Sequence, residues 1–164
     1  MNSNEVKQLA TAIHNADKPR PFQRLEKALD EMNTTYPRPT LPLLSLSPPF
    51  DVRQRTNTKK WPNAELPGVY IFLDEQQQVL YVGKESHSKL NVRLDSWFTK
   101  AGKPRLAKKA WVFGVHYVVT ICVPKSNSFE APAIEEFLIR RLCPLGNKHG
   151  RSTAFWHNFD QLSQ

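Results

Sequence analysis

Residues 67–84 read PGVYIFLDEQQQVLYVGK, two apolar runs on either side of a polar loop. The runs 69–73 and 79–82 are rich in the β-branched and aromatic residues typical of strands. Five polar residues separate them, so the pattern predicts an antiparallel hairpin with a five-residue loop. Each strand carries a tyrosine, Tyr70 and Tyr81, and antiparallel pairing can bring two such rings together on one face of a sheet.

The chain that follows the hairpin predicts two helices and another strand. Residues 88–98 and 130–142 carry apolar side chains at helical spacing, and Pro132 is compatible with the first turn of the second helix. The run 111–123, WVFGVHYVVTICV, predicts one long central strand. Together these elements describe an α+β fold, a small three-stranded antiparallel sheet flanked by helices.

The chain before the hairpin divides into a helical part and a proline-rich part. Helices are expected over 3–16 and 20–34. Six of the 13 prolines fall within 37–66, which therefore cannot hold a regular helix or a central strand. We interpret it as an extended basic arm that wraps the domain or lies on a ligand. The expected division is a helical N-terminal extension over 1–36, the arm, and a domain over 67–164.

Composition excludes several classes of protein. The net charge is +8 and the pI near 9.7, which favours a polyanionic partner such as nucleic acid. No run approaches the ~18 apolar residues that span a bilayer, and the N-terminus has no apolar signal core. Two cysteines, Cys122 and Cys143, are too few for a disulfide scaffold or a four-thiolate zinc site. A cytoplasmic location without membrane contact is expected.

Taken singly, the polar residues have ordinary interpretations beside chemical ones. Strand tyrosines usually pack, and Lys84 alone is a surface lysine. Arg93 could hold a phosphate in a bidentate manner or extend out of an amphipathic helix. Glu135 could coordinate a hard cation such as Mg²⁺ or pair with an arginine of its own helix.

Taken together, the same residues form an ordered set: Gly68-Val69-Tyr70, Tyr81-Val82-Gly83-Lys84, Arg93-Leu94, and EEFLIRRLCPLGN over 135–147. In order and spacing this set resembles the GIY-YIG nuclease family. It looks most like the N-terminal incision domain of bacterial excision-repair nucleases. The resemblance covers about residues 67–147.

The resemblance implies a metal-dependent endonuclease that hydrolyses phosphodiester bonds in DNA with Mg²⁺ or Mn²⁺. It implies these roles: Tyr70 deprotonates or orients the attacking water, Tyr81 orders that water or nearby phosphate oxygens, Lys84 assists with phosphate charge, Arg93 stabilises the pentacovalent phosphate, Glu135 binds the metal, and Asn147 anchors the ends of the site. Restriction, structure-specific and repair-like cutting stay open, as do a toxin-type nuclease and an inactive nucleic-acid-binding module of the same fold.

One position departs from the family. Four residues after the arginine the family commonly has Tyr or His, and this chain has Trp97. Indole donates a hydrogen bond and cannot titrate. Any proton-shuttling role there is lost or taken over, with His87 and His116 as candidates, although both have ordinary structural interpretations.

Phosphate contacts are expected from exposed cations around this site, although such runs can also be solvated loops. Candidates are Lys100, Lys103, Arg105, Lys108 and Lys109 in the connector after the first helix of the domain, Arg53, Arg55, Lys59 and Lys60 in the arm, and Lys148, His149 and Arg151 after Asn147. The partner expected is double-stranded DNA, with a homodimer for double-strand cleavage. The aromatic residues Phe155, Trp156 and Phe159 are expected to cap the core.

Overall fold

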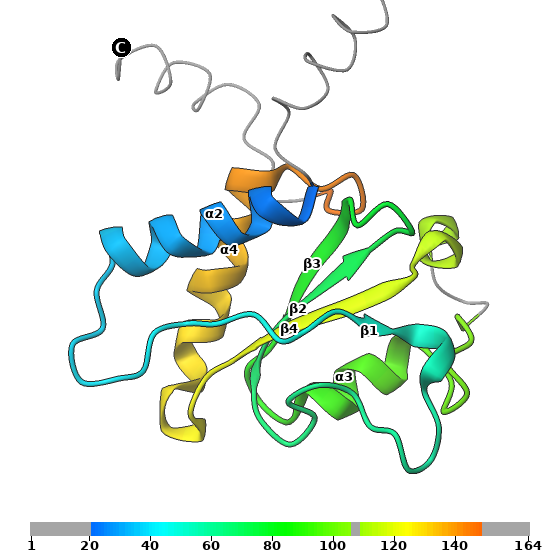
Figure 1. Ribbon diagram of the computed structural model, residues 1–164. Helices are drawn as coiled ribbons and strands as arrows, with labels where there is room; N and C mark the ends of the chain where they lie inside the picture. Colours follow the sequence, from blue (N-terminus) through cyan, green and yellow to red (C-terminus); the bar gives the residue numbers. More distant parts are fainter. Residues whose placement is uncertain (1–20, 106–108, 149–164) are drawn as a thin grey trace, which may run out of the picture.

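The computed structural model describes residues 21–105 and 109–148. The helix expected over 3–16, the cations Lys108, His149 and Arg151, and the aromatic residues Phe155, Trp156 and Phe159 lie outside these ranges. The described helices and strands, in chain order, are α2 Pro21–Thr35, β1 Phe50–Asp51, β2 Gly68–Leu73, β3 Val79–Glu85, α3 Leu90–Trp97, β4 Tyr117–Cys122 and α4 Ala131–Leu142 (Figure 1). None of these helices is long and apolar enough to cross a bilayer.

The sheet is antiparallel and has four strands, in the order β1-β4-β2-β3. The α+β prediction and the hairpin are confirmed, but the count of three strands is wrong. The fourth strand, β1, comes from the proline-rich arm, where Phe50 pairs with Val118 and Asp51 with Tyr117. An edge position suits such a segment, because Pro48 and Pro49 just before it have no N–H for a ladder.

The run 111–123 is not one strand. Residues Ala110–Gly114 form a 3-10 helix, and β4 begins only at Tyr117. The reason is the length of the neighbouring strand: β2 ends at Leu73, which pairs with Tyr117, and the chain then turns into the hairpin loop. His116 N–H still donates to the Leu73 carbonyl, but residues before His116 have no β2 residue to pair with. They close a local turn instead, in which Val115 N–H donates to the Val112 carbonyl.

Two apolar layers cover the two faces of the sheet. On one face, β2 and β3 pack against α2 and α4, and the cluster includes Leu25, Leu29, Ile71, Val82 and Leu138. On the other face lie α3 and the later part of the arm, residues 50–64, with a cluster that includes Tyr70, Phe72, Leu94, Trp97 and Trp61. Every residue of β2 is consequently buried. Helix α2 shares a core with the sheet, and the division of the chain into extension, arm and domain stays a prediction.

The arm follows the domain in an extended conformation. Ser47 N–H donates to the Thr120 carbonyl, and the Asn33 side chain exchanges hydrogen bonds with the backbone of Leu44. Further along, the Trp61 indole N–H donates to Asp95 on α3 at 2.8 Å. The arm is thus fastened to α2, β4 and α3 in turn.

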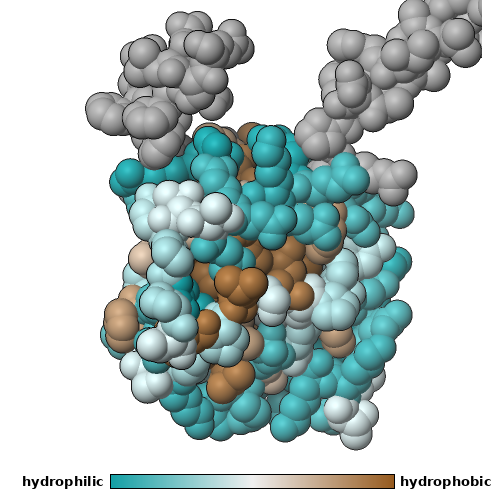
Figure 2. Space-filling model, turned by 60° about the vertical axis from the view of Figure 1, so that its left-hand side comes forward, coloured by the Kyte–Doolittle hydropathy of each residue, from teal (hydrophilic) through white to brown (hydrophobic). Residues whose placement is uncertain are grey.

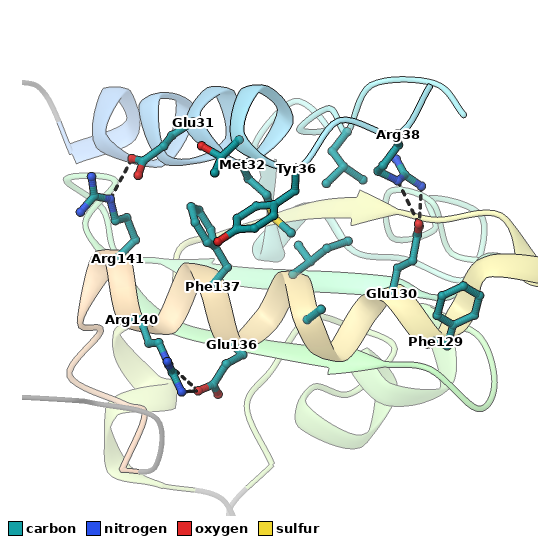
Figure 3. A pocket seen from close by; sticks show the side chains of 14 residues that line it. Glu31, Met32, Tyr36, Arg38, Phe129, Glu130, Glu136, Phe137, Arg140 and Arg141 are labelled. Carbon is teal, nitrogen blue, oxygen red and sulfur yellow. Dashed lines mark hydrogen bonds and ion pairs between the residues drawn. The ribbon is translucent and has the colours of Figure 1, made fainter. Parts of the chain in front are cut away.

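A groove of about 850 Å³ lies between α2 and α4 (Figures 2 and 3). It belongs to the helix side of the sheet, whereas the two tyrosines of the hairpin belong to the α3 side. The groove is therefore a feature separate from the site predicted by the sequence.

Candidate active site

Tyr70 stands at the centre of β2 and is fully buried. It lies opposite Gly83 in the hairpin register, and a Cβ at position 83 would come within 2.4 Å of the Tyr70 ring. Glycine is required there because the ring lies directly across the backbone of the neighbouring strand. The Tyr70 hydroxyl oxygen accepts a hydrogen bond from Trp97 Nε1 at 3.0 Å and one from Arg93 Nε at 3.4 Å.

Tyr81 lies beside Tyr70, with the two ring centroids 6.1 Å apart. Its other side stacks on Trp111, with centroids 4.9 Å apart and planes 21° from parallel. Tyr81 is half-buried, and the Tyr70 hydroxyl lies near enough to lower the pKa of the Tyr81 hydroxyl. The second tyrosine is therefore the one that solvent can reach.

Both phenols hold their protons strongly. Burial, with the nearby Tyr81, raises the pKa of Tyr70 well above its ordinary value, against the lowering effect of its bonds to Arg93 and Trp97. Burial raises the pKa of Tyr81 most, and the charge of Glu135 raises it further. The Tyr70 hydroxyl and the charge of Arg93 lower this pKa. At neutral pH both side chains are neutral hydroxyls in the unliganded protein.

Glu135 is half-buried on α4, which packs against β3. Burial raises the pKa of its carboxyl group and the charge of Glu136 adds to this, whereas the attraction of Lys84 and Arg93 lowers it. Glu136 turns away, since it pairs with Arg140 at 2.5 Å and lines the groove. Of the two adjacent glutamates, only Glu135 interacts with the tyrosines and cations of the hairpin side.

Asn147 closes the chain after α4 onto β3. Its side-chain oxygen accepts from Val82 N–H at 2.9 Å, and its amide nitrogen donates to the Val82 carbonyl at 2.8 Å. Lys84 Nζ donates to Ser86 Oγ at 2.9 Å. The fold thus brings Tyr70, Tyr81, Lys84, Arg93 and Glu135 to one place, with Asn147 fastening the neighbouring backbone.

Trp97 supplies a contact that the sequence left open. Its buried indole is a donor to Tyr70. His87 lies in an exposed loop, and His116 precedes β4 beside Tyr117 and near the Asp51 carboxylate. Trp111 was missed altogether, because its place in an apolar run indicated a strand rather than a stacking partner of Tyr81.

The described residues hold no group of three or more His, Cys, Asp or Glu side chains that could bind a metal ion. Mg²⁺ nevertheless suits this arrangement, because it commonly keeps several waters and binds through one or two carboxylates together with substrate phosphate oxygens. Glu135, a half-buried carboxylate between cations, fits the protein's share of such a ligand set.

The expected phosphate contacts differ in their surroundings. Lys100, Lys103, Arg105, Lys109 and Lys148 are exposed. Arg53 pairs with Asp51 but keeps 65% of its side chain exposed. Arg55 is 5% exposed, pairs with Asp95 at 3.4 Å and lies over the Trp61 ring. Its guanidinium joins the arm to α3, so we remove Arg55 from the phosphate-binding candidates.

Residues 66–148 match the family model of the UvrC-like GIY-YIG domain. The chain belongs to the GIY-YIG family. The chain is 37% identical over 75 residues to the UvrABC system protein C of Synechococcus sp. (strain JA-2-3B'a(2-13)). That match covers 45% of this chain and 11% of the cyanobacterial protein. The resemblance predicted from the separate motifs is confirmed: the chain carries a GIY-YIG nuclease domain of the UvrC type.

Proposed function

We propose that this GIY-YIG domain is an endonuclease that hydrolyses phosphodiester bonds in DNA with one divalent cation, Mg²⁺ or Mn²⁺. The observation that carries the proposal is the convergence of two tyrosines, two cations and a half-buried carboxylate from β2, β3, α3 and α4. Phosphodiester hydrolysis needs a positioned water, a proton acceptor and positive charge at the phosphate. Each of these requirements has a candidate residue at this site.

Arg93 and Lys84 bind and orient the scissile phosphate. Arg93 donates to Tyr70 through Nε, and its two terminal amino groups can hold two phosphate oxygens at once. Lys84 adds a second positive charge from the end of β3. A cation bound at Glu135 would neutralise the charge that develops on the phosphate.

We assign proton transfer to Tyr81 and a positioning role to Tyr70. The Tyr70 oxygen already accepts from two donors, so it has no lone pair left to take the proton of an attacking water. Tyr70 is also enclosed by the fold, whereas Tyr81 is open to solvent. Arg93 lowers the pKa of Tyr81 in the unliganded protein, and added positive charge at Glu135 would extend that effect.

DNA is the substrate class that the surface favours. The exposed connector cations Lys100, Lys103, Arg105 and Lys109 follow α3, which carries Arg93, and Lys148 follows Asn147. One such site cuts one strand, so cutting both strands requires a dimer or two successive binding events.

The test compares two neighbouring glutamates on supercoiled plasmid. With Mg²⁺ we expect nicking by the wild type and by Glu136→Gln, no nicking by Glu135→Gln, and none by any variant in EDTA. Glu136→Gln removes the same charge from the adjacent position, so it controls for the loss of a carboxylate. Undiminished cutting by Glu135→Gln would contradict the assignment of Glu135. Tight, salt-sensitive DNA binding by a wild type that never cuts would favour the inactive module instead.

A further inference from the structure

The groove between α2 and α4 has apolar walls that the described residues leave uncovered. Met32 and Tyr36 line it on the α2 side, Ile134 and Phe137 on α4, and Leu44 of the arm lies between them. Tyr36 is 58% exposed, although its ring packs edge-on against Phe137 with the ring centroids 6.0 Å apart. Figure 2 shows this apolar surface at the centre of the face, and Figure 3 shows the two rings inside the groove.

The charges around the groove neutralise one another. Its six charged lining residues form three ion pairs, seen in Figure 3: Arg38 with Glu130, Arg140 with Glu136, and Arg141 with Glu31. The chain as a whole carries a net charge of +8, but the groove lacks the excess positive charge that favours nucleic-acid binding. An occupant of the groove must therefore be apolar on one side and close to neutral.

The shape of the groove favours a helix as occupant. A channel between two packed helices accepts the convex ridge of a third helix, whereas the same channel on a second copy of the chain would present another hollow. One segment of this chain has the required pattern, residues 3–16, where Val6, Leu9, Ala10 and Ile13 recur at helical spacing. Such an apolar stripe is stable only when something covers it.

We propose that residues 3–16 form a helix that docks in the groove between α2 and α4. Only residues 17–20 separate this segment from Pro21, the first residue of α2, and a connection of that length joins antiparallel neighbouring helices. A 14-residue helix would be about 21 Å long and α2 about 22 Å long, at about 1.5 Å per residue. The docked helix therefore reaches along α2 to the groove walls.

Charge and tethering support the same occupant. Residues 3–16 contain one acid, Glu5, and one lysine, Lys7, which matches the neutral groove. A four-residue tether also places the segment at an effective concentration on the order of millimolar or above. A separate partner of similar affinity would have to compete against that concentration.

The test measures access to the groove in the full-length chain. In a background with Cys122→Ser and Cys143→Ser, Thr35→Cys puts one thiol on the groove wall, and its rate of maleimide labelling is followed. We expect Leu9→Asp to raise this rate about tenfold or more by releasing the helix. Gln8→Asp adds the same charge on the opposite side of the predicted helix and should leave the rate unchanged.

Three results would overturn the proposal. Equal labelling rates in the parent, Leu9→Asp and Gln8→Asp would mean that the segment does not cover the groove. A rate that rises with Trp156→Asp but not with Leu9→Asp would assign the groove to residues 149–164. Protection that disappears on dilution would assign it to a second copy of the chain. None of these readings depends on nuclease activity, so the proposed function is tested separately.

Discussion

The contact between Trp97 and Tyr70 gives one hydroxyl group a fixed direction. Tyr70 accepts from the indole at 3.0 Å and from Arg93 at 3.4 Å, which uses both lone pairs of the oxygen. A tyrosine or histidine at position 97 could either donate or accept a hydrogen bond, but an indole can only donate. Trp97 therefore gives the site a residue that only donates a hydrogen bond, where the family commonly has one that can also accept.

Trp97→Phe should lower kcat about tenfold, which corresponds to about 1.4 kcal/mol, with little change in KM. The variant keeps one aromatic ring but loses the donor and part of the buried indole, so the Tyr70 hydroxyl loses its direction. The measurement is steady-state cleavage of a labelled duplex, with circular dichroism to establish that the fold is retained.

The matched control is Trp61→Phe, which removes an indole donor of similar geometry from the same aromatic layer. Trp61 donates to Asp95 at 2.8 Å and does not reach Tyr70. Trp61→Phe should lower stability and leave kcat near the wild-type value. Equal losses of kcat in the two variants would show that Trp97 acts only through packing.

At the scale of elements, two side chains of the arm meet one carboxylate of α3, beside the backbone bonds from Leu90 and Asn91 N–H to the arm. Asp95 accepts from the Trp61 indole at 2.8 Å and from the buried Arg55 guanidinium at 3.4 Å. The same helix carries Arg93 and Trp97. The arm is therefore fastened to the same helix that carries two site residues.

Asp95→Ala should lower the free energy of unfolding by roughly 3 kcal/mol. It leaves a guanidinium that is 5% exposed with the Thr56 and Lys59 carbonyls but no carboxylate, and removing one partner of a buried pair costs about 3–5 kcal/mol. We expect the lower end of this energy range because the Asp95 side chain is 25% exposed. Denaturant unfolding measures the loss.

Glu65→Ala is the comparison for that experiment, because it breaks only the exposed pairs of Glu65 with Lys60 and Lys89. We expect it to change the unfolding midpoint very little. If the two alanine variants unfolded at the same denaturant concentration, the Asp95 contacts would not hold the arm.

The sequence predicted the helices and strands whose pattern lies within their own residues. The hairpin follows from two short apolar runs and a polar loop, and α4 follows from helical spacing and a proline in its first turn. The break before Tyr117 depends on where β2 ends, which no residue in 111–123 encodes. The two-residue strand β1 is too short to have a pattern, and the direction of the Trp97 indole follows only from the folded arrangement of α3 and β2.

At the scale of the whole molecule, the two faces of the sheet differ in charge and in content. The α3 side carries the tyrosines, and the basic connector follows α3 in the chain. The α2 and α4 side carries a groove whose charged residues pair with one another. The connector also forms a local turn, in which Gly102 N–H donates to the Thr99 carbonyl. DNA is therefore expected on the α3 side.

The salt dependence of DNA binding should report which cations meet phosphate. Each neutralised phosphate contributes about 0.9 unit to the slope of log K against log salt. Lys103→Ala with Lys109→Ala should lower that slope by about 1.8 units, as measured by fluorescence anisotropy over a range of salt concentrations. Lys27→Ala, an equally exposed lysine on α2, should leave it unchanged. A slope unaffected by the double change would place the DNA elsewhere.

The pairing of Asn147 with Val82 has a consequence for how the protein behaves among its own copies. Strand β3 ends the sheet, and an open sheet edge is a template on which another chain can add a strand. Asn147 occupies both outward-facing backbone groups of Val82, and Gly146 N–H occupies the Leu80 carbonyl. The loop that completes the candidate active site therefore also blocks that edge, and protects the sheet from edge-to-edge aggregation.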